Sequence, residues 1–214
     1  MMKILKIFTG RHVTSSLVIG SIILLLFILI GIFGARIAPY DSQEMHYEHL
    51  KEQPSGSFLL GTDRFGRDVL SRVIVGTRTT LTIAAFSTLL ALVIGILVGA
   101  SSAYFGGWVD NLIMRVNDIF ISFPTLIFAM LVVGVLGPSV VNGAIAIGII
   151  YAPRVGRVIR SAALSIVPLE YIDAARVRGE NAFYIIFREI LPNLLPTIIV
   201  EGSIRLGYAI LLSA

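Results

Sequence analysis

The chain has 214 residues, of which 56% are hydrophobic and only 14% are charged, and it contains no cysteine. Soluble domains are about a quarter charged, so this composition excludes an ordinary soluble protein, and the lack of cysteine excludes a disulfide framework, a thiolate metal site and a cysteine nucleophile. The net charge of +4 does not indicate a nucleic-acid partner, because the basic residues lie beside apolar runs and not on one face with interleaved aromatics.

The apolar runs predict membrane-spanning helices. About 20 helical residues cross a bilayer core, and the mean hydropathy of the chain is +0.90. One long run is divided at Gly137 and Pro138, because these residues break helices. The runs are continuous and do not alternate, which excludes a β-barrel. The sequence therefore predicts an all-α fold, a polytopic transmembrane helix bundle in one domain over residues 13–214, with spans at about 13–37, 79–103, 114–136, 138–158 and 194–214.

The charges beside the spans predict the orientation. Residues 1–12 carry Lys3, Lys6 and Arg11 without an acid, and such a flank stays in the cytoplasm. We therefore expect a cytoplasmic N-terminus, with the first apolar run kept as a helix because it is too long for a cleaved signal peptide. Threading the chain from there places the loop 38–78 outside the cell and the loop 159–193, which is rich in arginine, inside.

The inner loop contains signals for a short helix. Glu170 and Asp173 come early and Arg176 comes late, which matches the helix dipole, and Pro168 precedes the segment. Gly179 stands where a C-cap is expected. The sequence therefore predicts a helix that ends at this glycine.

A second, amphipathic helix is expected after this glycine. The segment ENAFYIIFREILPN places apolar residues at helical spacing, and Pro192 and Pro196 are expected to bound it. Its predicted apolar face consists of Phe183, Ile186, Phe187 and Ile190. The loop is thus expected to be a compact projection suited to docking.

Two segments carry a resemblance to a known family. DAARVRG followed by REILP resembles the EAA loop of ABC-importer permeases, with Glu189 departing from an isoleucine in the general pattern. LLGTDRFGRDVLSRVIVGTRTTL, residues 59–81, is similar to the segment before the second span in permeases of the dipeptide and oligopeptide importers. The matching loop residues are Asp173 in place of glutamate, Ala174, Ala175, Gly179, Leu191 and Pro192.

The resemblance implies a C-type permease subunit of a type I ABC importer, in the inner or plasma membrane, that forms half of a path for dipeptides or oligopeptides. Its partners would be a homologous permease, two cytoplasmic ATP-binding subunits and an extracytoplasmic substrate-binding protein. Family permeases have six spans, so five imply that the chain is truncated before the sixth helix. The residues expected to couple the path to the ATPase are Glu170, Asp173, Ala174, Ala175, Arg176, Gly179, Leu191 and Pro192.

No catalytic residue, metal ligand or cofactor is expected on this chain, and ATP and Mg²⁺ would bind the ATPase subunits. A phosphate-binding loop G-x-x-x-x-G-K-[ST] is absent from the sequence, so energy must be supplied by another chain. An intramembrane hydrolase is disfavoured, because no histidine lies within a predicted span. A secondary transporter driven by an ion gradient is the rival class, although the sequence has no evident inverted repeat.

Other motifs leave alternatives open. Glu201 and Arg205, four residues apart in the last span, either line the substrate path or neutralise each other. His46 and His49 suggest a nickel or metal-chelate substrate, with a plain solvated loop as the favoured interpretation. The charged residues of GTDRFGRD are expected to pin the outer loop by ion pairs. Gly95 and Gly99, residues with small-xxx-small spacing, predict a close contact between helices.

Overall fold

A computed structural model describes residues 15–213, which form helices joined by loops. Within this range no β-strand forms, and an isolated bridge joins Thr62 to Asp68. The predicted all-α class is thereby confirmed. The predicted cytoplasmic segment 1–12 lies outside the described residues. The chain divides into two compact units between Leu81 and Thr82.

The first unit contains helix α2 (Ser15–Ile37), an irregular loop and the beginning of helix α3 (Val69–Phe105). Nearly all of α2 is apolar and exposed, as expected of a helix that faces lipid. Its buried residues are glycines, and a Cβ added to Gly34 would lie 2.9 Å from the carbonyl oxygen of Ile74. The absence of a side chain therefore lets α2 approach the first turns of α3.

Helix α3 begins ten residues before the span predicted from Thr79, because a buried aspartate caps it. The Asp68 carboxylate accepts hydrogen bonds from the Ser71 backbone N–H at 2.8 Å and from the Ser71 hydroxyl at 2.6 Å. A side-chain acceptor at this position satisfies a backbone donor that the first helical turn leaves unpaired. The charged residues after Asp68 therefore belong to the helix and not to the loop.

The second unit contains helices α4 (Gly107–Ser122) and α5 (Thr125–Leu136), which form a sharp corner. The third predicted span, 114–136, includes the second half of α4 and all of α5, but the two helices are bent by 88° with respect to each other. Phe123 is extended at the break, because the following Pro124 disfavours the helical conformation. The prediction of one straight helix over this stretch is thus replaced by a broken pair.

Helix α6 (Val140–Ala163) follows the turn that glycine and proline predicted. Gly137 has a φ of +87°, and the Ser139 hydroxyl caps α6 by accepting from the Asn142 N–H at 3.1 Å. Against α3, α6 packs closely: a Cβ on Gly95 would lie 2.5 Å from a Val155 methyl carbon. The predicted close contact between helices is therefore confirmed, and it joins α3 to α6.

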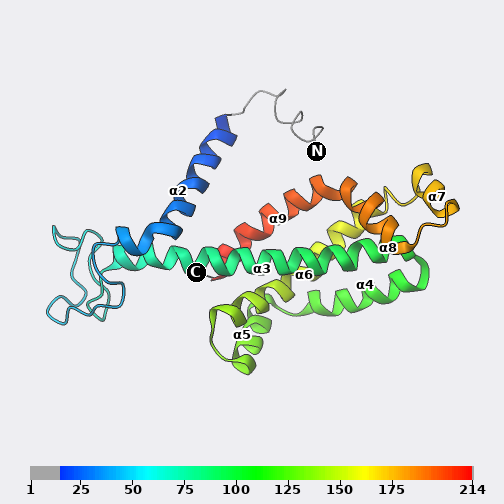
Figure 1. Ribbon diagram of the computed structural model, residues 1–214. Helices are drawn as coiled ribbons and strands as arrows, with labels where there is room; N and C mark the ends of the chain where they lie inside the picture. The colour runs from blue at the N-terminus through cyan, green and yellow to red at the C-terminus, as the bar shows by residue number, and fades with distance from the viewer. Residues whose placement is uncertain (1–14, 214) are drawn as a thin grey trace. The chain divides into compact units, whose positions relative to one another are not determined.

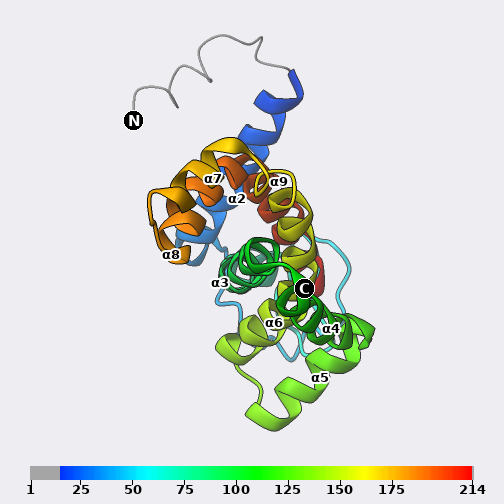
Figure 2. The ribbon, with the colours of Figure 1, turned by 90° about the vertical axis from the view of Figure 1, so that its right-hand side faces the viewer.

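The remaining elements are α7 (Glu170–Val177), α8 (Ala182–Tyr184), the π-helical segment η1 (Ile185–Ile190) and α9 (Leu191–Ser213). Figure 1 shows α4 returning along α3, with α7 and α8 near the end of α3 where that turn lies, and in Figure 2 this end faces the viewer. Helices α8, η1 and α9 form one continuous helix, so the prediction that prolines bound the amphipathic helix is wrong. Pro192 is the second residue after η1, next to the wider π turn, which changes the hydrogen-bond register so that the helix tolerates a residue without an N–H.

Within residues 15–213, three helices are long and apolar enough to cross a membrane: α2, α3 and the continuous helix Ala182–Ser213. Helices α4 and α5 add a fourth if the bent pair counts as one span. Helix α6, the fourth predicted span, is outside this group because Arg154 and Arg157 lower its apolar content. Its span stays a prediction, but twelve of its residues are buried, so protein surrounds much of it.

Candidate functional site

Helix α7 is held by two buried side chains and presents the rest of its surface outward. Ile172 and Ala175 are completely buried, in the same cluster as Ile159 of α6 and Ile190 of η1. They lie three residues apart and thus on one face of the helix. The side facing away from the bundle includes Val177, which is 88% exposed although it is apolar. A single exposed apolar residue is ordinary on a protein surface, so Val177 shows that this side of α7 is accessible but does not by itself assign a partner.

Gly179 ends α7 as predicted. Its φ is +82°, and its N–H donates to the Arg176 carbonyl at 3.0 Å while the Glu180 N–H donates to the Ala175 carbonyl at 3.2 Å. This pair of bonds is a Schellman motif, which satisfies carbonyls left open at a helix end. Nothing lies within 4 Å of a Cβ added here, so the backbone conformation alone requires glycine.

Side-chain contacts join α7 to two long helices. The Arg176 guanidinium lies over the Tyr104 ring of α3, 5.2 Å from its centroid, and also pairs with Asp173 at 2.9 Å. On the other side, the Asn193 amide of α9 donates to the Tyr171 hydroxyl at 3.1 Å. Burial raises the pKa of Tyr171, and the Glu189 carboxylate adds to the shift. A displacement of α7 would therefore be passed to both α3 and α9.

The π turn changes which residues of η1 face the bundle. Ile185, Ile186 and Ile190 are buried, whereas Phe183 is 70% exposed and Phe187 is 36% exposed. In a π-helix residues five apart share a face, so Ile185 replaces the phenylalanines that α-helical spacing predicted. The predicted face is therefore wrong for Phe183 and Phe187. These two rings stack on each other, with centroids 4.4 Å apart, outside the core.

The residues predicted to couple the path to an ATPase do not all lie on one surface. Glu170, Asp173, Ala174, Arg176 and Gly179 are exposed on or beside α7, and Ala175 is buried beneath it. Leu191 and Pro192 form the first turn of α9 and are not part of the outward surface of α7. We use "outward face of α7" for the exposed residues Glu170, Asp173, Ala174 and Val177.

A partly buried ion pair between α4 and α6 was missed by sequence reasoning. Arg160 of α6 donates through Nε to Asp110 of α4 at 2.6 Å, a second bond joins Arg160 Nη2 to the same carboxylate, and the Ser102 hydroxyl of α3 donates to it as well. The cluster joins three helices next to α7. The sequence does place an acid, Asp110, beside apolar spans, where a carboxylate needs a cation as partner. Spacing alone does not select that partner, because Arg154, Arg157 and Arg160 are equally plausible.

Glu201 and Arg205 pair along one face of α9, as their spacing predicted. Arg205 Nε donates to Glu201 Oε1 at 2.6 Å, and their side chains are only 13% and 6% exposed, respectively. The guanidinium lies 5.7 Å from the centre of the Tyr151 ring of α6 and 5.6 Å from that of Tyr208. The two charges thus neutralise each other, and two aromatic rings lie beside the guanidinium.

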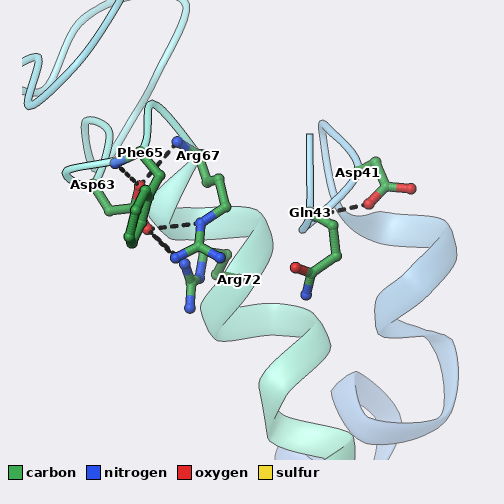
Figure 3. Close-up of polar contacts among 6 residues, drawn as sticks. All are labelled: Asp41, Gln43, Asp63, Phe65, Arg67 and Arg72. Atoms are coloured by element: carbon green, nitrogen blue, oxygen red, sulfur yellow. Dashed lines mark hydrogen bonds and ion pairs between the residues drawn. The ribbon is translucent and has the colours of Figure 1, made fainter. Parts of the chain in front are cut away.

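In the first unit, Asp63 organises the beginning of α3 (Figure 3). Its carboxylate pairs with Arg67 at 2.8 Å and Arg72 at 2.5 Å, and it accepts from the Phe65 N–H at 2.8 Å. Burial would raise the pKa of Asp63, but the hydrogen bonds from Arg67 and Phe65 outweigh it and lower the pKa from 3.8 to about 2. A separate turn is closed where the Gln43 N–H donates to Asp41 at 2.8 Å (Figure 3).

The two histidines of the loop do not converge on one point. The His46 ring packs against Tyr40 and Phe58, with centroids 5.4 and 5.2 Å away. His49 instead pairs with Glu52 at 2.5 Å. Over residues 15–213, no group of three or more histidine and acidic side chains is placed to hold a metal ion. Both rings lie against Phe58, which is 3% exposed, but the His49 side chain itself is 48% exposed at the surface of the loop.

Comparison with known proteins identifies the family. Residues 91–214 match the family model described as "Binding-protein-dependent transport system inner membrane component". The chain belongs to this family. The permease is 36% identical over 208 residues to a glutathione transport system permease protein GsiD of Pectobacterium atrosepticum, covering 97% of this chain and 68% of the relative. It is 39% identical over 197 residues to a dipeptide transport system permease protein DppC of Alkalihalophilus pseudofirmus, covering 92% and 65%.

A third relative is a di/tripeptide transport system permease protein DppC of Pseudomonas aeruginosa, 35% identical over 198 residues, with 90% of this permease and 65% of the relative covered. The permease thus spans about two thirds of the length of these relatives. Among solved structures, the MetNI methionine ABC transporter in inward-facing conformations matches with a TM-score of 0.56 at 24% identity, over 63% of this permease and 68% of that chain. This likeness shows a shared fold. The predicted resemblance to C-type peptide permeases of ABC importers is confirmed.

Proposed function

We propose that this chain is the transmembrane permease subunit of an ATP-binding-cassette importer and forms half of a path for dipeptides or oligopeptides. A homologous permease would form the other half, two cytoplasmic ATP-binding subunits would supply energy, and an extracytoplasmic protein would deliver the substrate. ATP and Mg²⁺ belong to the ATP-binding subunits, so this chain performs no chemistry itself. The relatives named for dipeptide, di/tripeptide and glutathione transport support a peptide substrate.

The observation that carries the proposal is the construction of α7. Its outward face combines two carboxylates, a small residue and an exposed valine, while Ile172 and Ala175 fix the helix to the core. Such a helix fits a cleft of a partner, because it is rigid and its apolar residue has no cover within residues 15–213. In the proposed mechanism the ATP-binding subunit grips this face, and its closure moves α7.

Motion of α7 would reach the spans through the two side-chain contacts already described. Arg176 acts on the end of α3 through Tyr104, and Tyr171 acts on the start of α9 through Asn193. Both helices have the length and composition of membrane spans. We infer that α7 lies in the cytoplasm, which requires a cytoplasmic N-terminus and an extracytoplasmic loop 38–78 in the five-span threading. The six arginines between Arg154 and Arg188 support this orientation.

We place Glu201 and Arg205 beside the path as the second part of the proposal. Glu201 is the eleventh of the 23 residues of α9, so it lies near the middle of a helix of spanning length. An ion pair at that depth is costly against lipid, which favours a position facing protein or the path. The aromatic rings of Tyr151 and Tyr208 lie beside the Arg205 guanidinium.

The test uses two substitutions in the α7 region and two matched controls. Asp173→Lys reverses a charge on the outward face and removes the partner of Arg176, and Gly179→Val puts a branched residue at a φ of +82°. Glu48→Lys reverses an exposed acid of the other loop, and Gly20→Val fills a helical site with nothing within 4 Å.

We expect all four variants to insert in the membrane. The two α7 variants should retain roughly a tenth or less of the co-purifying ATP-binding subunit, since losing about 1.4 kcal/mol of affinity has this effect. Peptide uptake should fall with it, while both controls behave as the unaltered chain. Normal co-purification and uptake in both α7 variants would contradict the coupling role. Uptake that persists with an ion gradient and an inactive ATPase would favour a secondary transporter instead.

A further inference from the structure

A basic hollow lies at the start of α3, in the first unit of the chain, whereas the proposed coupling region belongs to the second. It is lined by Asp63, Arg64, Arg67 and Arg72 with the apolar residues Val69 and Val73, and its volume is about 650 Å³. The three arginines and one aspartate leave a net charge of +2, because Asp63 is a single anion shared by Arg67 and Arg72. Nothing in the transport mechanism uses this excess positive charge.

Donors remain available in the hollow. Asp63 engages Arg67 through Nε and Nη2 and engages Arg72 through Nη1 alone, so most of the Arg72 guanidinium is unused. Within residues 15–213 no carboxylate pairs with Arg64, whose guanidinium rests on the Phe65 ring at 5.0 Å from the centroid. Arg67 lies over the same ring at 4.8 Å. The aromatic ring therefore holds the two guanidinium groups beside each other without neutralising them.

The position of the hollow along α3 places it at the depth of lipid headgroups. The charge-free apolar stretch of α3 begins after Arg78, and Arg72 is six residues earlier, which corresponds to about 9 Å along a helix. The headgroup layer on each side of the hydrocarbon core is roughly 5–8 Å thick, so the backbone of Arg72 lies at its outer edge and the long arginine side chain can reach back to the phosphates. Val73, 56% exposed, and Phe65, 42% exposed, present apolar surface next to the arginines, as interfacial residues do.

We propose that this hollow binds the phosphate of an anionic phospholipid in the leaflet that meets the loop 38–68. Guanidinium groups bind phosphate oxygens through paired hydrogen bonds, and the net charge of +2 favours a lipid with net negative charge over a zwitterionic one. Arg64 and Arg72 bind the phosphate, while Asp63 keeps Arg67 in place. Val73 contacts the first carbons of the acyl chain.

The experiment measures lipid binding by the permease, purified with its copurifying subunits and depleted of lipid. Native mass spectrometry follows titration with phosphatidylglycerol or phosphatidylcholine, for the unaltered chain, Arg64→Gln and Lys51→Gln. Lys51→Gln is the matched control, because it removes one exposed charge from the same loop but does not line the hollow. Arg64→Gln breaks no ion pair within residues 15–213, so the loop should stay folded.

We expect phosphatidylglycerol to bind more tightly than phosphatidylcholine, and Arg64→Gln to weaken it roughly five- to tenfold, in line with the loss of a charge-assisted hydrogen bond. Lys51→Gln should change it less than twofold. Equal binding of both lipids, or equal binding by Arg64→Gln and the unaltered chain, would overturn the proposal. Displacement of the lipid by millimolar inorganic phosphate would identify a free-anion site instead.

Arg64→Gln should also leave binding of the extracytoplasmic substrate-binding protein unchanged. A variant that loses that protein but keeps the lipid would assign the hollow to a protein partner and overturn the lipid site. The lipid measurement requires neither ATP nor knowledge of which side the loop faces. Its failure is therefore distinguishable from failure of the proposed transport function, which is judged by ATPase co-purification.

Discussion

The contact between α3 and α6 allows a quantitative prediction for Gly99→Ala. A Cβ at this position would lie 2.4 Å from the Gly156 carbonyl oxygen and 2.8 Å from the Arg160 backbone nitrogen. Carbon and oxygen in contact are normally about 3.3–3.6 Å apart, so the two helices must separate by roughly 1 Å. Both clashing atoms are backbone, so no side-chain rotation relieves them.

Overpacking of this kind costs about 1–3 kcal/mol, and alanine recovers up to about 1 kcal/mol through its higher helix propensity. We therefore expect Gly99→Ala to destabilise the folded chain by roughly 1–2 kcal/mol, a loss of about 2–8 °C in Tm. The matched control is Gly207→Ala in α9, where nothing lies within 4 Å, and it should be neutral or slightly stabilising.

Thermal unfolding in detergent measures the difference, with fluorescence of the single tryptophan, Trp108, as the probe. Because Trp108 is in the first turn of α4, its emission reports on the end of the bundle where α3 turns back. If Gly99→Ala and Gly207→Ala unfold at the same temperature, the close approach of α3 and α6 is wrong. The arrangement that places Tyr104 beneath Arg176 would then lose its support.

Two further predictions concern ion pairs. Because the pKa of Asp63 is lower in the folded loop, its stabilisation of about 2 kcal/mol is complete above roughly pH 4 and is lost as the pH falls towards 2. Asp63→Asn should therefore speed tryptic cleavage between Lys51 and Arg72 at pH 7.5, and an unchanged rate would refute the clamp. Glu201→Gln leaves Arg205 buried and unpaired and should destabilise the chain by about 3–5 kcal/mol. Adding Arg205→Gln should restore most of this, as measured by Tm, and no restoration would argue against a coupled pair.

Local signals predicted much of the fold. The apolar runs indicated helices, and the turn at Gly137 and the end of α7 at Gly179 followed from residues whose backbone preferences act alone. Gly95 and Gly99 also indicated a close approach, because small residues leave room for a second backbone. The spacing of Glu201 and Arg205 on one helix allowed an ion pair as one of two alternatives, and the structure contains that pair.

Features that depend on distant partners were not predictable in the same way. The corner at Pro124 is hidden in a continuous apolar run, and hydropathy does not distinguish a bent helix from a straight one. The π turn of η1 changes which residues form the buried face, so α-helical spacing selected Phe183 in place of Ile185. The partner of Asp110 required the fold itself, because three arginines of α6 are spaced along one segment.

The central claim is that the outward face of α7 lies in the cytoplasm and is covered by an ATP-binding subunit. Since the chain has no cysteine, Val177→Cys introduces a single thiol at a position that is 88% exposed. Its labelling by a membrane-impermeant maleimide is the most direct measurement. We predict labelling in inverted vesicles stripped of the ATP-binding subunits, protection when those subunits are bound, and no labelling of intact cells. Labelling from outside intact cells, or equal labelling with and without those subunits, would contradict the account.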